Sequence, residues 1–345
     1  MARSVPSLPR VLVDTYGRRM EEIFSPSDRG RLHETVEVLW GRDEPMPIPD
    51  AQAAMRHATA VVCSGWRYGE VPADASSLRA IIDVGGGFPP TIDYADCFSR
   101  GIRVMTVAPG FGPQVAEMAL GMALASCREI VAGDRAMRTN DEAWAHAGNT
   151  TTFMLYRQPV GLIGFGSIAK CLKALLAPFD TPIMASDPWL SDGYLRSQGV
   201  QAVTLERLMR SSRVIFVLAA PTSENRALLS RELLELIQPG SVLVLISRAH
   251  VIDFDALTEL VSAGRFKAAV DVFPVEPLAR DHPIRRAPGA ILSAHRAGAV
   301  KEGLWDLGEM VVDDLEALAR GLPPQRLQAA TPELVGRLSR PETGR

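Results

Sequence analysis

Short runs of apolar residues recur along the whole 345-residue chain, and stretches of helical character separate them. Each run is continuously apolar rather than alternating with polar residues, which is typical of parallel strands covered on both faces of a sheet. Such strands are joined by crossover helices, so the pattern predicts an α/β fold. The predicted strands are residues 11–13, 60–62, 80–82, 160–163, 183–185, 214–217, 242–245 and 268–270.

A long helical stretch divides these strands into two series. It runs from Gln114 to about Arg138 and is followed by a polar segment up to Thr151. With 47% hydrophobic residues, a chain of this length has enough apolar material for two cores. We therefore predict two doubly wound parallel-sheet units. A further helix is expected over about 300–320, stopped by Gly321, and it could complete either unit.

The charge and hydropathy of the chain exclude several classes of partner. The formal net charge is −3 and no run of lysine or arginine stands out, so neither nucleic acid nor an anionic membrane surface is expected. No window approaches the roughly 18 uninterrupted apolar residues of a membrane span. Residues 1–10 lack the apolar stretch of a secretion signal. These features predict a cytoplasmic protein.

The cysteines and histidines form no metal-site pattern. The cysteines make no C-x-x-C motif and lie in apolar or helical contexts typical of ordinary buried thiols. No two histidines lie at metal-ligand spacing, so no metal is expected, although ligands from distant segments could converge. The residues concerned are Cys63, Cys97, Cys127 and Cys171, and His33, His57, His146, His250, His282 and His295.

A glycine-rich turn follows the predicted strand 160–163 and opens a helix. Its first glycine permits a tight turn, its second lets the backbone approach a pyrophosphate, and Ala169 lets helix and strand pack closely. The helix N-terminus then offers free N–H groups to phosphate oxygens. The motif consists of Gly164, Phe165, Gly166, Ser167, Ile168 and Ala169. It predicts a dinucleotide site, because the next strand ends at Asp187, where an acid would hold the ribose 2′-hydroxyl.

The acid at position 187 also favours NAD over NADP. A carboxylate there repels a 2′-phosphate, and the residues directly after it include no arginine that could receive one. The alternative is that Gly164 and Gly166 only form a tight turn and that Asp187 only caps a loop.

Three residues that follow predicted strands match the chemistry of 2-oxo acid reduction. That reaction needs a cation for the carboxylate, a proton donor for the developing alkoxide and a group that keeps the donor protonated. Arg248, Glu276 and His295 each come just after an apolar run, where the loops at the carboxyl ends of strands lie. Taken singly, each also has an ordinary interpretation as a surface, loop-end or turn residue.

Four stretches in the same order resemble the D-isomer-specific 2-hydroxyacid dehydrogenases. They are residues 160–169, 246–253, 271–278 and 294–298. The resemblance extends from roughly residue 60 to residue 324, and the first sixty residues match only in expected topology. It implies an NAD-dependent oxidoreductase that transfers a hydride to or from C2 of a small 2-oxo or 2-hydroxy acid of D configuration.

The resemblance also implies residue roles. Arg248 would bind the substrate carboxylate and polarise the carbonyl, His295 would be the general acid and base, and Glu276 would hold His295. The loop of Gly85, Gly86 and Gly87 would offer backbone N–H groups to the substrate carboxylate. Further cofactor contacts would come from Ala220, Pro221, Ile246, Ser247, Asp271 and Gly298, with Asp271 at the nicotinamide carboxamide.

The domain organisation implied by the resemblance is discontinuous. A Rossmann-type NAD domain at 116–299 would be inserted into a flavodoxin-like substrate domain made of 1–115 and completed by 300–345. The helix that begins the NAD domain would pack in a homodimer. The resemblance also makes a substrate like glyoxylate or hydroxypyruvate an expectation.

Some positions depart from the family pattern, and two other functions stay open. Ala249, Arg296 and the segment from Phe88 replace the usual residues without removing a catalytic group. Arg296 motivates the hypothesis of a substrate with a second anionic group, against the alternative of a surface ion pair. The other functions are a dehydrogenase of a small donor such as phosphite or formate, and an NAD-sensing binding protein without catalysis.

Overall fold

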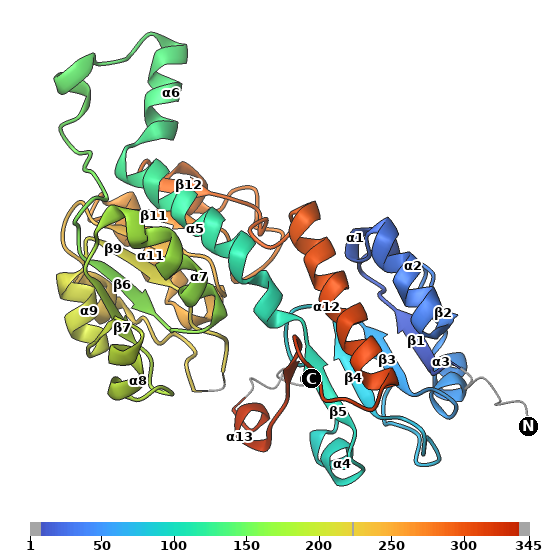
Figure 1. Cartoon of the computed structure of the whole chain (residues 1–345). Helices are drawn as coiled ribbons and strands as arrows, with labels where there is room; N and C mark the ends of the chain where they lie inside the picture. The colour runs from blue at the N-terminus through green and yellow to red at the C-terminus, as the bar shows by residue number, and fades with distance from the viewer. Residues whose placement is uncertain (1–7, 223, 338–345) are drawn as a thin grey trace, which may run out of the picture. The chain divides into compact units, whose positions relative to one another are not determined.

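The computed structural model describes residues 8–222 and 224–337 and divides the chain into two compact units (Figure 1). Unit 1 comprises Met1–Phe111 and Val300–Arg345, and unit 2 comprises Gly112–Ala299. The first boundary therefore follows residue 111 rather than residue 115. Within the described ranges, no helix is long and apolar enough to cross a membrane.

Unit 1 is a six-stranded sheet in the order β13-β5-β4-β3-β1-β2. All its strands are parallel except the short β13, which pairs antiparallel with β5 at the edge. The strands are β1 (Arg10–Asp14), β2 (Glu37–Trp40), β3 (Ala60–Cys63), β4 (Ala80–Asp83), β5 (Arg103–Thr106) and β13 (Gln328–Ala329). The helices are α1 (Met20–Ile23), α2 (Pro26–Thr35), α3 (Ile48–Met55), α4 (Tyr94–Ser99), η1 (Ala108–Phe111), α12 (Lys301–Ala319) and α13 (Pro332–Val335).

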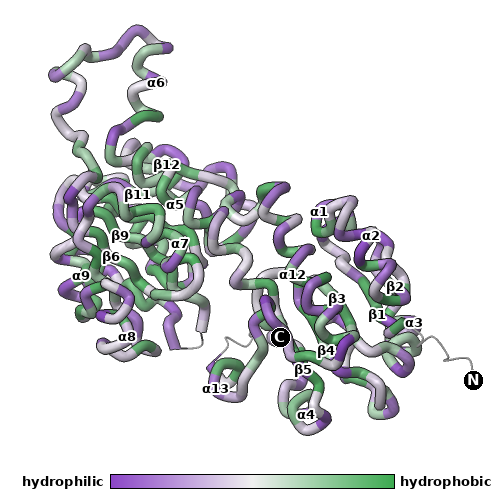
Figure 2. The backbone as a smooth tube through the Cα atoms, viewed as in Figure 1, coloured by the Kyte–Doolittle hydropathy of each residue, from purple (hydrophilic) through white to green (hydrophobic). Residues whose placement is uncertain are grey.

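Two cores cover the two faces of this sheet. Val11 and Val13 of β1 pack with the apolar side of α12, whereas Leu12 packs with Met55 of α3. Because successive strand residues point to opposite faces, a continuously apolar strand serves both cores. Figure 2 shows hydrophobic residues gathered along the strands. The predicted doubly wound architecture is confirmed.

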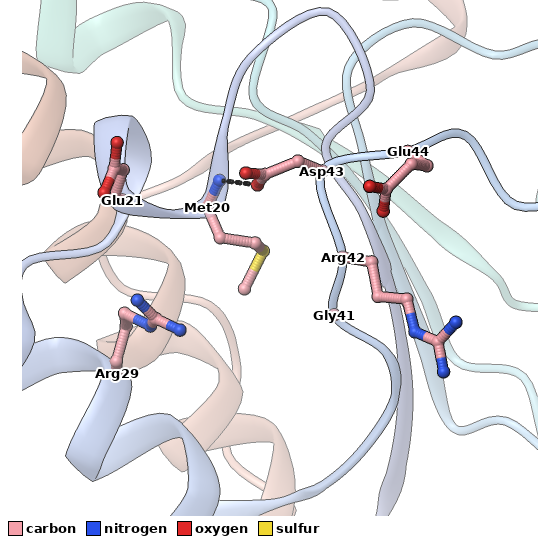
Figure 3. A pocket seen from close by; sticks show the side chains of 7 residues that line it. All are labelled: Met20, Glu21, Arg29, Gly41, Arg42, Asp43 and Glu44. Carbon is pink, nitrogen blue, oxygen red and sulfur yellow. Dashed lines mark hydrogen bonds between the residues drawn. The ribbon is translucent and has the colours of Figure 1, made fainter.

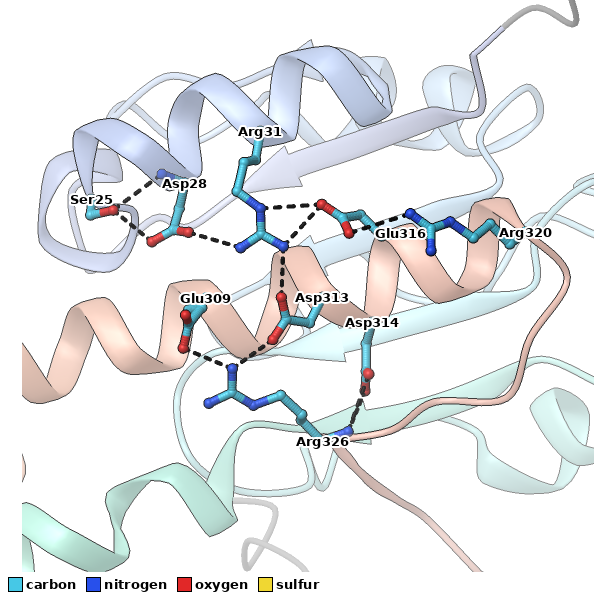
Figure 4. A network of polar contacts seen from close by, with 9 residues as sticks. All are labelled: Ser25, Asp28, Arg31, Glu309, Asp313, Asp314, Glu316, Arg320 and Arg326. Atoms are coloured by element: carbon cyan, nitrogen blue, oxygen red, sulfur yellow. Dashed lines mark hydrogen bonds and ion pairs between the residues drawn. The ribbon is translucent and has the colours of Figure 1, made fainter.

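A network of charged side chains joins α2 to α12 within unit 1 (Figure 4). The Arg31 guanidinium Nη2 lies 2.7 Å from Asp313 and 2.9 Å from Glu316. Buried Asp314 accepts hydrogen bonds from the backbone N–H groups of residues 325–327 at 2.7 to 3.2 Å. These bonds return the chain to the sheet, where Gln328 begins β13.

Unit 2 is a seven-stranded parallel sheet in the order β12-β11-β10-β9-β6-β7-β8. The strand order reverses at β6, which makes the carboxyl end of β6 a topological switch point, where open α/β sheets bind ligands. The strands are β6 (Val160–Ile163), β7 (Ile183–Ser186), β8 (Gln201–Ala202), β9 (Val214–Val217), β10 (Val242–Leu245), β11 (Lys267–Val270) and β12 (Ala290–Leu292). The α-helices are α5 (Gly112–Cys127), α6 (Ile130–Thr139), α7 (Ser167–Leu176), α8 (Asp192–Ser197), α9 (Leu205–Ser211), α10 (Arg231–Glu235) and α11 (Phe254–Ser262). The 3-10 helices are η2 (Ala145–Gly148), η3 (Ala177–Phe179), η4 (Ala249–Val251) and η5 (Pro283–Arg286).

The helical stretch predicted from Gln114 to about Arg138 forms as two helices rather than one continuous helix. The structure breaks it at Glu129, whose backbone is left-handed with φ of 51°, and so forms α5 and α6. The Glu129 carboxylate there pairs with Lys267 at 2.5 Å and accepts from the Thr151 hydroxyl at 2.7 Å. Helix α6 has no buried residue and stands away from the sheet of unit 2 (Figure 1).

Replacing Gly308 with alanine should destabilise unit 1. A Cβ at this position of α12 would lie 2.0 Å from the Ile23 carbonyl oxygen, so the helices would have to move apart. We expect a loss of about 1–3 kcal/mol, as for other overpacked cores, measured by urea denaturation. Gly30→Ala in α2 is the control, because its Cβ meets nothing within 4 Å and should stabilise by roughly 0.5–1 kcal/mol. Equal stability of the Gly308→Ala variant and the parent would contradict the packing described.

Candidate active site

The glycine turn after β6 has the geometry of a phosphate-binding turn. Gly164 has φ of 88°, and a Cβ there would lie 2.8 Å from the Ala219 backbone, so no side chain fits. Gly166 is the exposed N-cap of α7, and no side chain caps the helix. A Cβ on Gly166 would meet open space. The first-turn N–H groups of α7 are thus available to an anion, as a dinucleotide pyrophosphate requires.

Asp187 lies beside this turn, at the end of β7. Its Oδ2 accepts the Phe165 N–H at 2.8 Å and its Oδ1 accepts the Trp189 N–H at 2.9 Å. The acid is therefore fixed next to the glycine turn and only partly buried. This is the position from which a carboxylate reaches an adenosine ribose, so the turn, the helix N-terminus and the acid together fit NAD.

His295 and Glu276 are hydrogen-bonded to one another. His295 Nδ1 lies 2.6 Å from Glu276 Oε2, and Glu276 Oε1 accepts the Phe273 N–H at 2.9 Å. A carboxylate only accepts, so Nδ1 carries the proton and donates it. Among the described residues nothing pairs with Nε2, and the two side chains are 43% and 35% exposed. The imidazole is thus fixed through Nδ1, and Nε2 is available to a substrate.

Asp271 fixes the backbone that carries His295. Its two carboxylate oxygens accept the N–H groups of Arg296 and Ala297 at 2.9 and 3.1 Å, and its carbonyl accepts the His295 N–H at 2.8 Å. The family resemblance implied that Asp271 contacts the nicotinamide carboxamide. The structure instead encloses it completely, at 0% exposure, and commits both oxygens to the turn.

Arg248 follows β10 on the same edge of the sheet. Its Nη1 donates to the Ser247 carbonyl at 2.8 Å, and its side chain is exposed. In the described part of the chain no carboxylate lies within ion-pair distance of its guanidinium. Ile246, Ser247 and Ala249 are buried around it, and the Ser247 hydroxyl has no hydrogen-bond partner among the described residues. The guanidinium is therefore available to an external carboxylate.

Two side chains, Asn225 and His250, fasten the loop after β9 to the Arg248 segment. The amide nitrogen of Asn225 donates to the Ala220 carbonyl at 2.7 Å, and its amide oxygen accepts the Thr222 N–H at 2.9 Å. The nitrogen and oxygen of the amide are thereby assigned. The same oxygen lies 3.1 Å from His250 Nε2. That nitrogen must then be the donor. Burial lowers the pKa of the His250 imidazole, and the charges of Arg226 and Arg248 lower it further. No sequence motif indicated this pair.

The structure thus gathers most of the predicted residues of unit 2 along the carboxyl edge of one parallel sheet. The glycine turn follows β6, Asp187 follows β7, Ala220 and Pro221 follow β9, Arg248 follows β10, and the His295–Glu276 pair follows β11 and β12. Gly298 lies beside α5, where its carbonyl accepts from Gln114 at 3.3 Å. No cluster that could hold a metal ion occurs within residues 8–222 and 224–337.

In unit 1 the glycine loop differs from the expected cradle. Gly85 and Gly87 donate their N–H groups to Oδ1 of Asp83, at 2.8 and 3.5 Å, and Gly65 donates to Oδ2 at 2.6 Å. The resemblance implied that the N–H groups of Gly85 to Gly87 bind a substrate carboxylate. In the structure, two of these N–H groups already donate to the internal carboxylate of Asp83.

A separate hollow of unit 1 is lined by none of the motif residues (Figure 3). It is lined by Met20, Glu21, Arg29, Gly41, Arg42, Asp43 and Glu44. Its charged side chains of both signs converge on no common point, and Asp43 is already used by the Met20 N–H at 2.8 Å. The sequence analysis assigned none of these residues, and the geometry gives them no ligand chemistry.

Comparison with known proteins identifies the family. Residues 120–297 match the model described as "D-isomer specific 2-hydroxyacid dehydrogenase, NAD binding domain". The chain belongs to the D-isomer specific 2-hydroxyacid dehydrogenase family. The match lies inside unit 2, so unit 2 is its NAD-binding domain, as the glycine turn predicted.

Several relatives carry names within this family. A D-3-phosphoglycerate dehydrogenase of Mycobacterium tuberculosis is 27% identical over 91% of this chain, but this chain spans only 58% of that relative's length. A glyoxylate reductase of Thermofilum pendens is 30% identical over 74% of this chain and 76% of its own length. The crystal structure of a phosphoglycerate oxidoreductase from Rhizobium etli matches with a TM-score of 0.82 and 36% identity, covering 94% of this chain and 98% of that one.

Gly166→Ala should keep the fold and weaken NADH binding. The added methyl group meets no protein atom within 4 Å, yet it would occupy the space through which the pyrophosphate approaches the backbone. We expect an at least tenfold larger dissociation constant for NADH, measured by fluorescence titration, with an unchanged unfolding temperature. Gly164→Ala is the contrasting variant and should lower stability, because its Cβ meets the Ala219 backbone. Unaltered NADH affinity of Gly166→Ala would remove this turn from the cofactor site.

Proposed function

We propose that the protein is an NAD-dependent oxidoreductase that interconverts small 2-oxo acids and D-2-hydroxy acids. The observation that carries this proposal is the 2.6 Å hydrogen bond between His295 and Glu276 on the carboxyl edge of the NAD-binding domain. Unit 1 is proposed as the substrate domain. The names of relatives, glyoxylate reductase and phosphoglycerate dehydrogenase, agree with this reaction class.

In the proposed reaction Arg248 binds the substrate carboxylate. A guanidinium matches the two oxygens of a carboxylate with two parallel N–H donors, and Arg248 is not neutralised by a described acidic side chain. Its remaining N–H groups polarise the neighbouring carbonyl oxygen. Asn225 and His250 keep the adjoining loop in place beside it.

His295 supplies the proton of the reduction. NADH, when bound at the glycine turn, supplies the hydride that reaches the carbonyl carbon. As negative charge develops on the oxygen, Nε2 of the imidazolium donates a proton to it, and the carboxylate of Glu276 stabilises the cationic ring through Nδ1. Asp271 keeps the ring in position through the backbone. In the oxidation direction, neutral His295 takes the hydroxyl proton.

A substrate panel tests the reaction class directly. Glyoxylate, hydroxypyruvate and pyruvate are assayed by loss of NADH absorbance, and phosphite and formate are assayed with NAD in the opposite direction. Turnover of 2-oxo acids supports the proposal. Turnover of phosphite or formate alone would show that the protein oxidises a small donor instead of a 2-hydroxy acid. NADH binding without any turnover would favour a sensing protein.

His295→Gln should abolish most of the reduction while the cofactor still binds. Glutamine can fill the space but gives up no proton, so we expect kcat/KM for the best 2-oxo acid to fall by about 10²–10⁴. The NADH dissociation constant should stay within about twofold, because the proton is transferred only in the chemical step. His57→Gln, at an exposed position of unit 1, is the matched control. Undiminished turnover by His295→Gln would remove this residue from the mechanism.

We also propose a cytoplasmic homodimer formed through α6 and the segment that follows it. A ten-residue helix with no buried residue has little stability of its own in water. Its apolar side chains Val131 and Met137 are exposed, and Trp144 beyond it is 72% exposed. Exposed apolar side chains gathered on one segment favour association. The four cysteines are free, which suits a reducing compartment.

A double variant, Val131→Glu with Met137→Glu, should dissociate the dimer. The free energy needed to bury two unpaired carboxylates at the contact exceeds the free energy gained on association. Sedimentation equilibrium at micromolar concentration should show a dimer for the parent and a monomer for this variant. Leu322→Glu, at an exposed apolar position of unit 1, should stay dimeric. A monomeric parent, or a dimeric double variant, would contradict the proposed interface.

A further inference from the structure

The segment that follows β9 lies directly against the glycine turn of the cofactor site. The Leu218 N–H donates to the Ile163 carbonyl at 2.8 Å, just before that turn. A Cβ on Gly164 would lie 2.8 Å from the Ala219 backbone, so Ala219 fills the space beside the turn. Strands β6 and β9 are neighbours in the sheet of unit 2. A shift of the segment Ala219–Thr222 would therefore alter one side of the cofactor turn.

The Asn225 side chain holds this segment by two hydrogen bonds. Its amide nitrogen donates to the Ala220 carbonyl at 2.7 Å, and its amide oxygen accepts the Thr222 N–H at 2.9 Å. Ala220 is exposed and Pro221 is only half-buried. An exposed segment gains little order from burial, so its position depends strongly on the hydrogen bonds that it makes.

His250 connects Asn225 to a part of unit 2 that is fixed independently. The His250 Nε2 atom lies 3.1 Å from the Asn225 amide oxygen. The backbone around His250 is held on its own account, because its carbonyl accepts the Ala227 N–H at 2.7 Å and the Val251 carbonyl accepts the Leu229 N–H at 2.9 Å. Val251 and Leu229 are fully buried. His250 is thus the fixed end of the contact, and the segment Ala219–Thr222 is the end that it restrains.

The charge state of His250 suits this contact. Burial lowers the pKa of its imidazole, and the charges of Arg226 and Arg248 lower it further, so the ring is neutral at pH 7. A neutral imidazole has a single N–H group, and the Asn225 oxygen can only accept. That N–H group is therefore on Nε2 and is used for Asn225.

We propose that His250 is a positioning residue for the cofactor, which acts through Asn225 and keeps the segment Ala219–Thr222 beside the glycine turn in the arrangement that binds NADH. The inference deepens the proposed function and rests on it only where turnover is measured. Neither side chain takes part in the proposed hydride or proton transfer. Loss of the contact should therefore weaken NADH binding and leave the chemical step intact.

Removal of either partner tests the inference. In His250→Leu the NADH dissociation constant, measured by fluorescence titration, should rise about fivefold, as expected for one net hydrogen bond. In Asn225→Leu it should rise about tenfold or more, because both bonds to the segment are lost as well. With saturating NADH and 2-oxo acid, kcat of both variants should stay within about twofold of the parent. Unfolding temperatures check that each variant is folded, and His250→Ala is used if His250→Leu does not fold.

Two further variants distinguish positioning from a general loss of structure. The amide N–H group of glutamine can replace the Nε2–H group, so His250→Gln should keep NADH affinity within about twofold of the parent. The double variant His250→Leu with Asn225→Leu should bind NADH like Asn225→Leu alone, because His250 acts only through Asn225.

Gln238→Leu is the matched control. The Gln238 amide also donates to a backbone carbonyl, that of Arg210 at 2.7 Å, but it does so before β9 and β10 begin, at the opposite edge of the same sheet. Its NADH affinity should equal that of the parent.

Each outcome decides the matter. Weaker NADH binding with retained kcat, recovery in His250→Gln and a double variant like Asn225→Leu support the inference. Parent-like NADH affinity in the folded leucine variants overturns it, and so does a lowered kcat with unchanged NADH affinity, which would place the effect on Arg248 instead. Independent, multiplying effects in the double variant also overturn it. A parent that binds NADH but reduces no 2-oxo acid overturns the proposed function, while the NADH dissociation constants still decide the role of His250.

Discussion

The hydrogen bond between His295 and Glu276 depends on the parallel pairing of β11 with β12. Glu276 comes from the loop after one strand and His295 from the loop after the next, so the pair forms only when the two strands run side by side in the same direction. The Asp271 carboxylate then fixes the turn at 2.9 and 3.1 Å. A directed imidazole is therefore a consequence of sheet register, and the chemistry proposed for it requires that register.

Aspartates at strand ends organise the loops in both units. Asp14 ends β1 and pairs with Arg67, Asp83 ends β4, and Asp187 and Asp271 follow β7 and β11. Each carboxylate accepts at least one backbone N–H of a nearby loop. Parallel sheets leave loops with unpaired N–H groups at their carboxyl edges, and a short acidic side chain satisfies them without a further strand or helix. The same device shapes the cofactor turn, the His295 turn and the glycine loop.

The sequence predicted those elements whose signal is local. Fully buried central strands such as β6 and β10 appear in the sequence as continuous apolar runs. The glycine turn is identified by the spacing of its glycines. Strands β2 and β5 were not predicted, because β2 is an edge strand with no buried residue and β5 has only two apolar residues, between Arg103 and Thr106. The helix break could not be predicted either, since Glu129 is a good helix former and leaves the helix for contacts with Lys267 and Thr151. The carboxylate of Asp83, which holds the glycine loop, also accepts the N–H of Gly65, 18 residues away in a different loop, and this arrangement has no sequence signature.

The place of α12 in the chain has a consequence for biosynthesis. This helix follows all of unit 2 in the sequence, yet its apolar side completes one of the two cores of unit 1. A chain synthesised from its N-terminus can finish the sheet of unit 2 while this core of unit 1 is covered only by α1 and α2. During that interval Val11, Val13 and Val62 lack the apolar side chains of α12 that complete their core. The core of unit 1 is therefore completed only after the whole NAD-binding domain has been synthesised.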